Sequence, residues 1–123
     1  MVRKKIRLLL VFGLLLLLVT SVIGGELPAQ GTEQVIRVTA QKFVHSPRDI
    51  ALKKGQPVTL EFTSRDVMHG FNCPDLGIRS DILPGKITTL RFTPGKVGTF
   101  PFHCDNFCGS GHEEMTGTIK VTE

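Results

Sequence analysis

The chain has no tryptophan and no tyrosine among its 123 residues, so its eight phenylalanines must supply the aromatic core of any fold. It also has no excess of one charge once its N-terminus is set aside. Arg3, Lys4, Lys5 and Arg7 account for the net charge of +4, and the remaining 11 Lys and Arg balance 11 Asp and Glu. Because a phosphate backbone demands clustered cations, this composition argues against nucleic acid as a partner.

The sequence has only one long apolar run, at its extreme N-terminus, which excludes a polytopic membrane protein. The basic residues 3–7 followed by Leu8 to Val19, almost all Leu and Val, have the order of an export signal. Residues 8–25 carry no charge and as a helix reach about 27 Å, so an uncleaved membrane anchor fits equally well. In either case we expect the remainder to lie outside the cytoplasmic membrane, in the periplasm or at the cell surface.

We therefore predict a signal peptide or N-terminal membrane anchor over residues 1–25, a linker over 26–33 and one folded domain over 34–123. The domain has little helical periodicity and many short runs rich in Val, Ile, Thr and Phe. In Val58–Thr63, alternation places Val58, Leu60 and Phe62 on one face and polar residues on the other. Such runs, separated by Pro and Gly turns, predict an all-β antiparallel sandwich. The expected strands are 35–40, 57–63, 87–92, 98–102 and 117–121.

Cysteine is scarce, and two of the three cysteines lie in one short segment, Cys104 to Met115. The side chains that can bind a metal there are Cys104, Cys108, His112 and Met115. Three, three and two residues separate them, so one folded loop can aim all four at a common point, with Gly109 and Gly111 allowing it to turn.

A fifth candidate, His69, lies 35 residues before Cys104 and must come from another strand. Thiolate, imidazole and thioether together suit copper, whereas magnesium and calcium prefer oxygen ligands. With two thiolates close enough to bridge, the loop can hold two copper ions.

Three plainer interpretations leave part of this pattern unexplained. A disulfide between Cys104 and Cys108 gives no reason for the spacing of His112 and Met115. A zinc site would use Cys104, Cys108, His69 and His112 as ligands and would give no role to Met115. A mononuclear blue-copper site leaves Cys104 as a bystander, and is the closest competitor.

Residues 34–123 resemble the copper-binding domain of cytochrome c oxidase subunit II, which has a dinuclear CuA centre; nitrous oxide reductase has a similar module. Besides the ligand loop, the resemblance includes Ser64–Phe71, Asp81–Gly85 and Gly117–Val121. It implies a cupredoxin-like Greek-key β-sandwich. It also implies the roles of the metal ligands, in which Cys104 and Cys108 bridge both coppers, His69 and Met115 complete one ion, and His112 and the backbone carbonyl of Asn106 complete the other.

The function that the resemblance implies is one-electron transfer, as a subunit of a haem-copper terminal oxidase. The chain would accept electrons from a c-type cytochrome and pass them towards haem-copper oxidase subunit I, where oxygen is reduced. A closed ligand set leaves no place for a substrate, so the chain is not expected to be catalytic alone. The alternative is a free-standing exported electron carrier, or a copper-binding or delivery protein.

Two departures from the family limit what can be carried over. Many oxidase subunits have Glu where Asn106 stands, and its carboxylate joins a magnesium site, so no magnesium site is predicted here. Many relatives also present an exposed Trp for electron entry, which this chain lacks. The resemblance therefore does not identify the surface that meets the electron donor.

The other reactive residues have ordinary interpretations. Cys73 is predicted to be a buried free thiol, and Glu113 and Glu114 to be solvated loop residues. His45, next to Ser46-Pro47 in an expected loop, is interpreted as solvated. His103 adjoins Cys104 at a strand end, so its side chain should point away from the ligand side.

Overall fold

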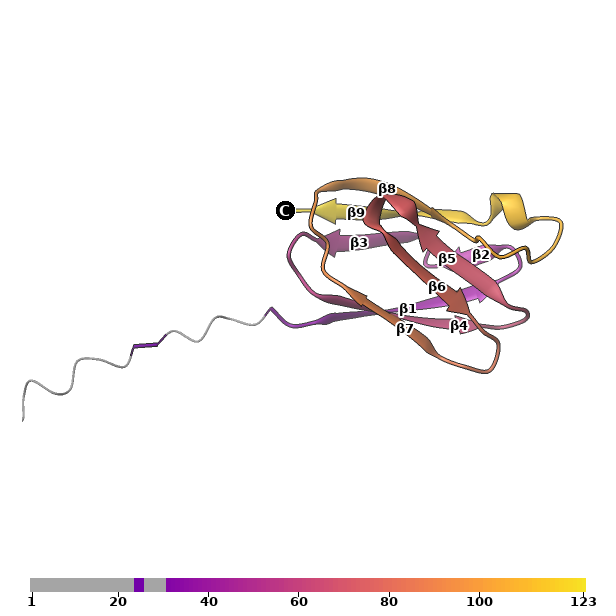
Figure 1. Cartoon of the computed structure of the whole chain (residues 1–123), viewed down its shortest axis with the longest axis horizontal. Helices are drawn as coiled ribbons and strands as arrows, with labels where there is room; N and C mark the ends of the chain where they lie inside the picture. Colours follow the sequence, from indigo (N-terminus) through magenta and orange to yellow (C-terminus); the bar gives the residue numbers. More distant parts are fainter. Residues whose placement is uncertain (1–23, 26–30) are drawn as a thin grey trace, which may run out of the picture. The chain divides into compact units, whose positions relative to one another are not determined.

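The computed structural model describes residues 24–25 and 31–123 (Figure 1). The predicted signal or anchor helix and most of the predicted linker lie outside these residues. Within the described part of the chain, no helix is long and apolar enough to cross a membrane. The described elements are the strands β1 (Gln34–Gln41), β2 (Val44–Ser46), β3 (Asp49–Lys53), β4 (Val58–Ser64), β5 (His69–Cys73), β6 (Ile78–Ile82), β7 (Thr88–Phe92), β8 (Gly98–His103) and β9 (Thr116–Thr122), and the short 3₁₀ helices η1 (Pro74–Leu76) and η2 (His112–Glu114).

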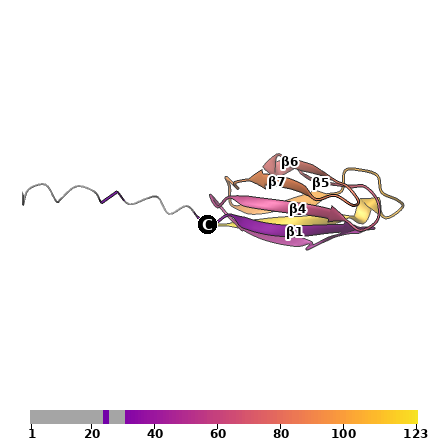
Figure 2. The ribbon, with the colours of Figure 1, turned by 90° about the horizontal axis from the view of Figure 1, so that it is seen from below.

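The strands form two sheets, with the order β2-β1-β4-β7 in one and β3-β9-β8-β5-β6 in the other. Figure 2 shows β1, β4 and β7 in the first sheet. The all-β sandwich was predicted, but a purely antiparallel one is wrong, because β1 pairs with β4, and β3 with β9, in parallel. Side-chain alternation reports which face of a strand is buried and carries no information on strand direction.

The core lies between the sheets and follows the alternation read from β4. Val58, Leu60 and Phe62 are each at most 1% exposed. Thr59, expected on the polar face, is nevertheless buried, and its hydroxyl donates a hydrogen bond to the carboxylate of Glu33. A polar side chain is tolerated there because it has a partner.

The aromatic part of the core extends towards one end of the sandwich. Phe71 of β5 lies 4.9 Å from Phe62 and 4.6 Å from Phe102 between ring centroids. The same buried cluster includes Cys104, Cys108 and Met115. The predicted metal-binding loop is therefore continuous with the hydrophobic core.

Four strands, β2, β3, β5 and β6, are absent from the predicted ranges, although His69 was correctly expected to come from another strand. That strand is β5 (HGFNC), which carries His69 and lies between β8 and β6. Histidine, glycine and asparagine are not typical strand formers, so local preference did not reveal its bounds. Its pairing with β6, from His69 opposite Ile82 to Cys73 opposite Ile78, holds it in the sheet.

Candidate metal centre

The segment between β8 and β9 forms a closed loop that carries most of the candidate ligands. Its ends are joined by a hydrogen bond from the backbone N–H of Cys104 to the carbonyl of Met115, at 3.0 Å. Gly109 has φ of +138°, a backbone conformation that residues with a side chain rarely adopt, so this glycine makes the turn possible. Gly111 has φ of −98° and serves differently, because a Cβ there would overlap the ring of Phe43.

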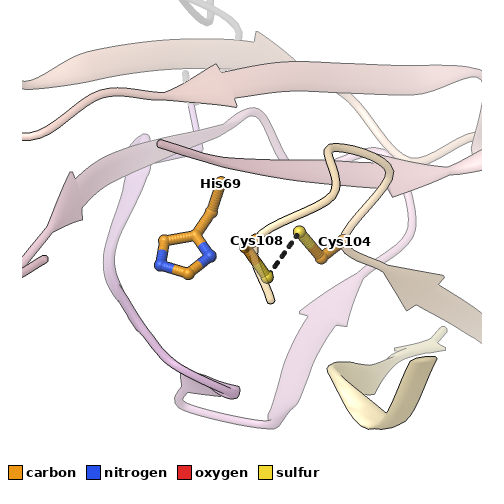
Figure 3. A group of neighbouring side chains, drawn as sticks. All are labelled: His69, Cys104 and Cys108. Carbon is orange, nitrogen blue, oxygen red and sulfur yellow. Dashed lines mark hydrogen bonds between the residues drawn. The ribbon is translucent and has the colours of Figure 1, made fainter. Parts of the chain in front are cut away.

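Three of the predicted ligands meet at the buried base of this loop. His69, Cys104 and Cys108 are 0%, 2% and 7% exposed, and one ligand atom from each lies within 4.8 Å of the others. Figure 3 shows the imidazole of His69 beside the two sulfur atoms. His69 comes from β5 and both cysteines come from the loop, so the site joins two parts of the fold.

The other three predicted donors lie next to the same sulfur atoms. The Sγ atom of Cys108 is 3.6 Å from Nδ1 of His112 and 3.8 Å from Sδ of Met115. The Sγ atom of Cys104 is 3.1 Å from the carbonyl oxygen of Asn106 and 3.9 Å from the Sγ atom of Cys108. All six donors predicted from the sequence are thus near neighbours.

The hydrogen bonding of His69 leaves one ring nitrogen available. Its Nε2 atom lies 2.7 Å from the carboxylate of Asp66, while its Nδ1 atom is buried and has no hydrogen-bond partner. A buried unpartnered nitrogen is costly unless something else binds it. A carboxylate on the far nitrogen is also the usual way in which a protein orients a metal-binding histidine.

Asp66 is itself held in its charged form. Burial pushes the pKa of its carboxyl upward, but hydrogen bonds from the backbone N–H of Lys42, from His69 and from the N–H of Val67 outweigh this and lower the pKa to about 2. The carboxylate therefore remains a hydrogen-bond acceptor for His69 at neutral pH. Asp66 was not among the predicted site residues, although its position three residues before His69 was a usable signal.

The two cysteines of the loop are free thiols. Their sulfur atoms are 3.9 Å apart, far from the length of a disulfide bond, about 2.0 Å, and both cysteines are unpaired. Burial, together with the neighbouring Cys104, raises the pKa of the Cys108 thiol. Because a metal binds the thiolate, a metal held by Cys108 would have to displace the proton of this thiol.

The donor set fits copper. It combines two thiols, two imidazoles, a thioether and one backbone carbonyl, with no carboxylate among the six, whereas magnesium and calcium would require oxygen ligands. Met115 is fully buried, and its sulfur lies beside that of Cys108. A zinc site uses Cys, His and carboxylate ligands, so it would not explain this placement of Met115.

The prediction for His45 was wrong. This histidine lies in β2, is 0% exposed, and donates a hydrogen bond from Nε2 to the carbonyl of Gly70 at 3.0 Å. Burial lowers its pKa and keeps the ring neutral. The Ser46-Pro47 pair indicated a loop, and a three-residue strand is too short to show alternation.

The predictions for Cys73, Glu113 and Glu114 were confirmed, and the direction of the His103 side chain stays a prediction. Cys73 is a buried free thiol, and burial raises its pKa. Glu113 and Glu114 are exposed, as expected of solvated loop residues, and His103 is half-buried.

An apolar surface lies over the cysteines. Phe107 is 77% exposed and Met68 is 40% exposed. With Val67 and Asn106 they line an open depression that reaches Cys108. Phe107, on the solvent side of the site, directly precedes the candidate metal ligand Cys108 in the chain.

Comparison with known proteins agrees with this geometry. The family model of a cupredoxin-like domain matches residues 8–121. Cytochrome c oxidase subunit 2 of Thermus thermophilus is 35% identical over 102 residues, which cover 78% of this chain and 76% of that protein. A second, longer subunit 2 from the same species has the same identity, and this chain spans 61% of its length.

A solved structure extends the comparison to the fold. The periplasmic domain of subunit II of cytochrome oxidase (CoxB) of Bradyrhizobium japonicum superimposes with a TM-score of 0.67 at 22% identity, covering 73% of this chain and 84% of that one. The predicted cupredoxin-like sandwich is therefore confirmed. The chain belongs to the cytochrome c oxidase subunit II family and contains its cupredoxin-like copper domain.

Proposed function

We propose that this protein transfers single electrons through a dinuclear copper centre, as the electron-entry subunit of a haem-copper terminal oxidase. The observation that carries the proposal is the buried, unpartnered Nδ1 atom of His69 beside two free thiols. Copper bound there would supply a one-electron couple between Cu(I) and Cu(II). Family membership supports the oxidase role.

In this proposal Cys104 and Cys108 would each contribute a thiolate to both copper ions. His69 and Met115 would complete the ligands of one ion, and His112 and the backbone carbonyl of Asn106 those of the other. Cys108 contacts both Met115 and His112, which belong to different ions in this proposal, and this supports a sulfur atom shared by the two ions. Cys104 contacts the Asn106 carbonyl. The division of the other donors between the two ions rests on the family resemblance.

The chain's contribution is to hold these donors in place. His69 is fixed by β5 and by Asp66, and the loop is closed by the hydrogen bond between Cys104 and Met115. Donors that move little between oxidation states favour rapid electron transfer. Six donors for two ions leave no open position for a substrate, so oxygen reduction belongs to the haem-copper subunit I partner.

We place the meeting point with a c-type cytochrome at the apolar surface of Phe107 and Met68. The ring of Phe107 lies 5.6 Å from that of the candidate ligand His112, so a donor seated there approaches the ligands closely. The N-terminal segment would keep the domain outside the cytoplasmic membrane, as a cleaved signal or as an anchor.

The direct test uses the full 123-residue chain, produced with copper and purified from its membrane or soluble fraction. We expect two coppers per chain and an electron paramagnetic resonance spectrum in which one unpaired electron is shared by two copper nuclei. One copper with a blue-copper spectrum, or zinc alone, would overturn the dinuclear proposal. Copurification with a haem-containing subunit separates the oxidase role from a free-standing carrier, which would purify alone.

A further inference from the structure

His45 connects the two sheets next to the metal centre. It belongs to β2, in the four-stranded sheet, and its Nε2 atom lies 3.0 Å from the carbonyl oxygen of Gly70 in β5, in the five-stranded sheet. A carbonyl only accepts hydrogen bonds, so Nε2 carries the proton and donates it. The ring packs edge-on against Phe71 and Phe102, with centroids 5.9 and 5.4 Å away.

Gly70 is the residue through which this contact reaches the ligands. It directly follows His69, and its backbone N–H donates a hydrogen bond to Sγ of Cys104 at 3.4 Å. A Cβ at this position would overlap the carboxylate of Asp105, which Arg79 holds at 2.6 Å. Gly70 is thus confined between His45 on the core side and Asp105 on the other.

We propose that His45 is a positioning residue of the metal centre: by holding the Gly70 carbonyl, it keeps the Gly70 N–H directed at the Cys104 sulfur and thereby raises the reduction potential. This inference rests on the proposed copper function. A hydrogen bond to a metal-bound thiolate stabilises the more electron-rich, reduced state, and hydrogen bonding around a cysteine sulfur is an established way of tuning copper sites.

Packing alone does not explain a histidine here. An apolar ring would fill the space among Phe71 and Phe102 without burying polar atoms. His45 instead buries an Nδ1 atom that has no partner, which costs free energy, and uses its other nitrogen only for Gly70. The polar contact with Gly70 is therefore the feature that distinguishes histidine from a simple core residue.

The test compares three variants of the full chain. In H45Q the side-chain amide nitrogen can take the place of Nε2, so the hydrogen bond to Gly70 is retained. In H45N the amide is shorter and cannot reach, and in H45F the ring volume is kept without a donor. We expect H45Q to keep the reduction potential of the native protein, and H45N and H45F to lower it while still binding two coppers.

A second measurement follows the same contact without any metal. Hydrogen exchange of the Gly70 amide, observed by nuclear magnetic resonance in the reduced metal-free protein, should be faster in H45N and H45F by about fivefold, as expected for losing a hydrogen bond of ordinary strength. In H45Q it should match the native protein.

Opposite results would overturn the inference. If His45 affected the centre only through local polarity, H45F would make the surroundings more apolar, favour the less charged reduced state and raise the potential. Equal potentials and equal Gly70 exchange in H45Q and H45N would also contradict positioning, even if H45F failed to fold. Failure of the native protein to bind two coppers would instead overturn the proposed function, and the metal-free exchange would still decide the role of His45.

Discussion

The loop that carries most of the candidate ligands and the hairpin between β1 and β2 contribute to the candidate centre in opposite ways. The loop from Cys104 to Met115 carries five of the six donors, and its residue types and their spacing in the sequence already indicate a metal site. The hairpin lies far earlier in the chain and carries none. Yet the ring of Phe43 lies so close to Gly111 that a Cβ there would overlap it, and Gly109 is almost as close.

The hairpin also reaches the strand that carries His69. The backbone N–H of Lys42 donates to the carboxylate of Asp66 at 2.8 Å, and His45 donates to Gly70. Asp66 lies three residues before His69 in the chain, and Gly70 directly follows it. One segment therefore determines which metal can bind, while another, which carries no candidate ligand, determines where the donors lie.

The largest effect is expected in the loop, from Cys108→Ser. Serine cannot replace a bridging thiolate, so the shared-electron spectrum should disappear and the copper content should fall below two per chain. Cys73→Ala is the matched control, because Cys73 is equally buried but makes none of the sulfur contacts of the centre. An unchanged spectrum in Cys108→Ser would contradict its bridging role.

The contrast between the two regions also explains what could be predicted from the sequence. The donors Cys104, Cys108, His112 and Met115 are close in the chain, so their spacing alone indicated a common site. His69 could be added because imidazole suits the same metal. The metal preference of a donor depends on its residue type, so it can be inferred from the sequence without any knowledge of the fold.

The support provided by the hairpin could not be predicted in this way. Nothing local links His45 to Gly70 or Phe43 to Gly111, since these contacts exist only after the two sheets face each other. The parallel pairing of β1 with β4 was missed for the same reason. Alternation correctly placed Leu60 in the core, but it does not say which strands become neighbours.

A smaller but clear effect is expected where the hairpin meets the loop, from Gly111→Ala. The added Cβ would overlap the ring of Phe43, so we expect the metal-free protein to lose about 1–3 kcal/mol of unfolding free energy in urea. Gly95→Ala is the control, because no atom lies within 4 Å of its Cβ position.

The overlap can be relieved to test its cause. Adding Phe43→Ala to Gly111→Ala removes the opposing ring, so the double variant should be less destabilised than the sum of the two single variants. Additive losses would mean that the cost of Gly111→Ala arises elsewhere, and that the hairpin does not support the loop through this contact.

The smallest effect on the centre itself is expected from Phe107→Ser, on the solvent side of the loop. Because Phe107 is 77% exposed, its removal should change the unfolding free energy by no more than about 0.5 kcal/mol and leave the copper spectrum unchanged. Electron transfer from a c-type cytochrome should nevertheless slow, and the apparent affinity for the cytochrome should weaken about tenfold, as for loss of an aromatic contact at an interface.

Val97→Ser is the control, because Val97 is 49% exposed and precedes β8, whose far end leads into the loop. Equal rates for the two variants would place the donor on another face and leave the loop's apolar surface without a role in electron entry.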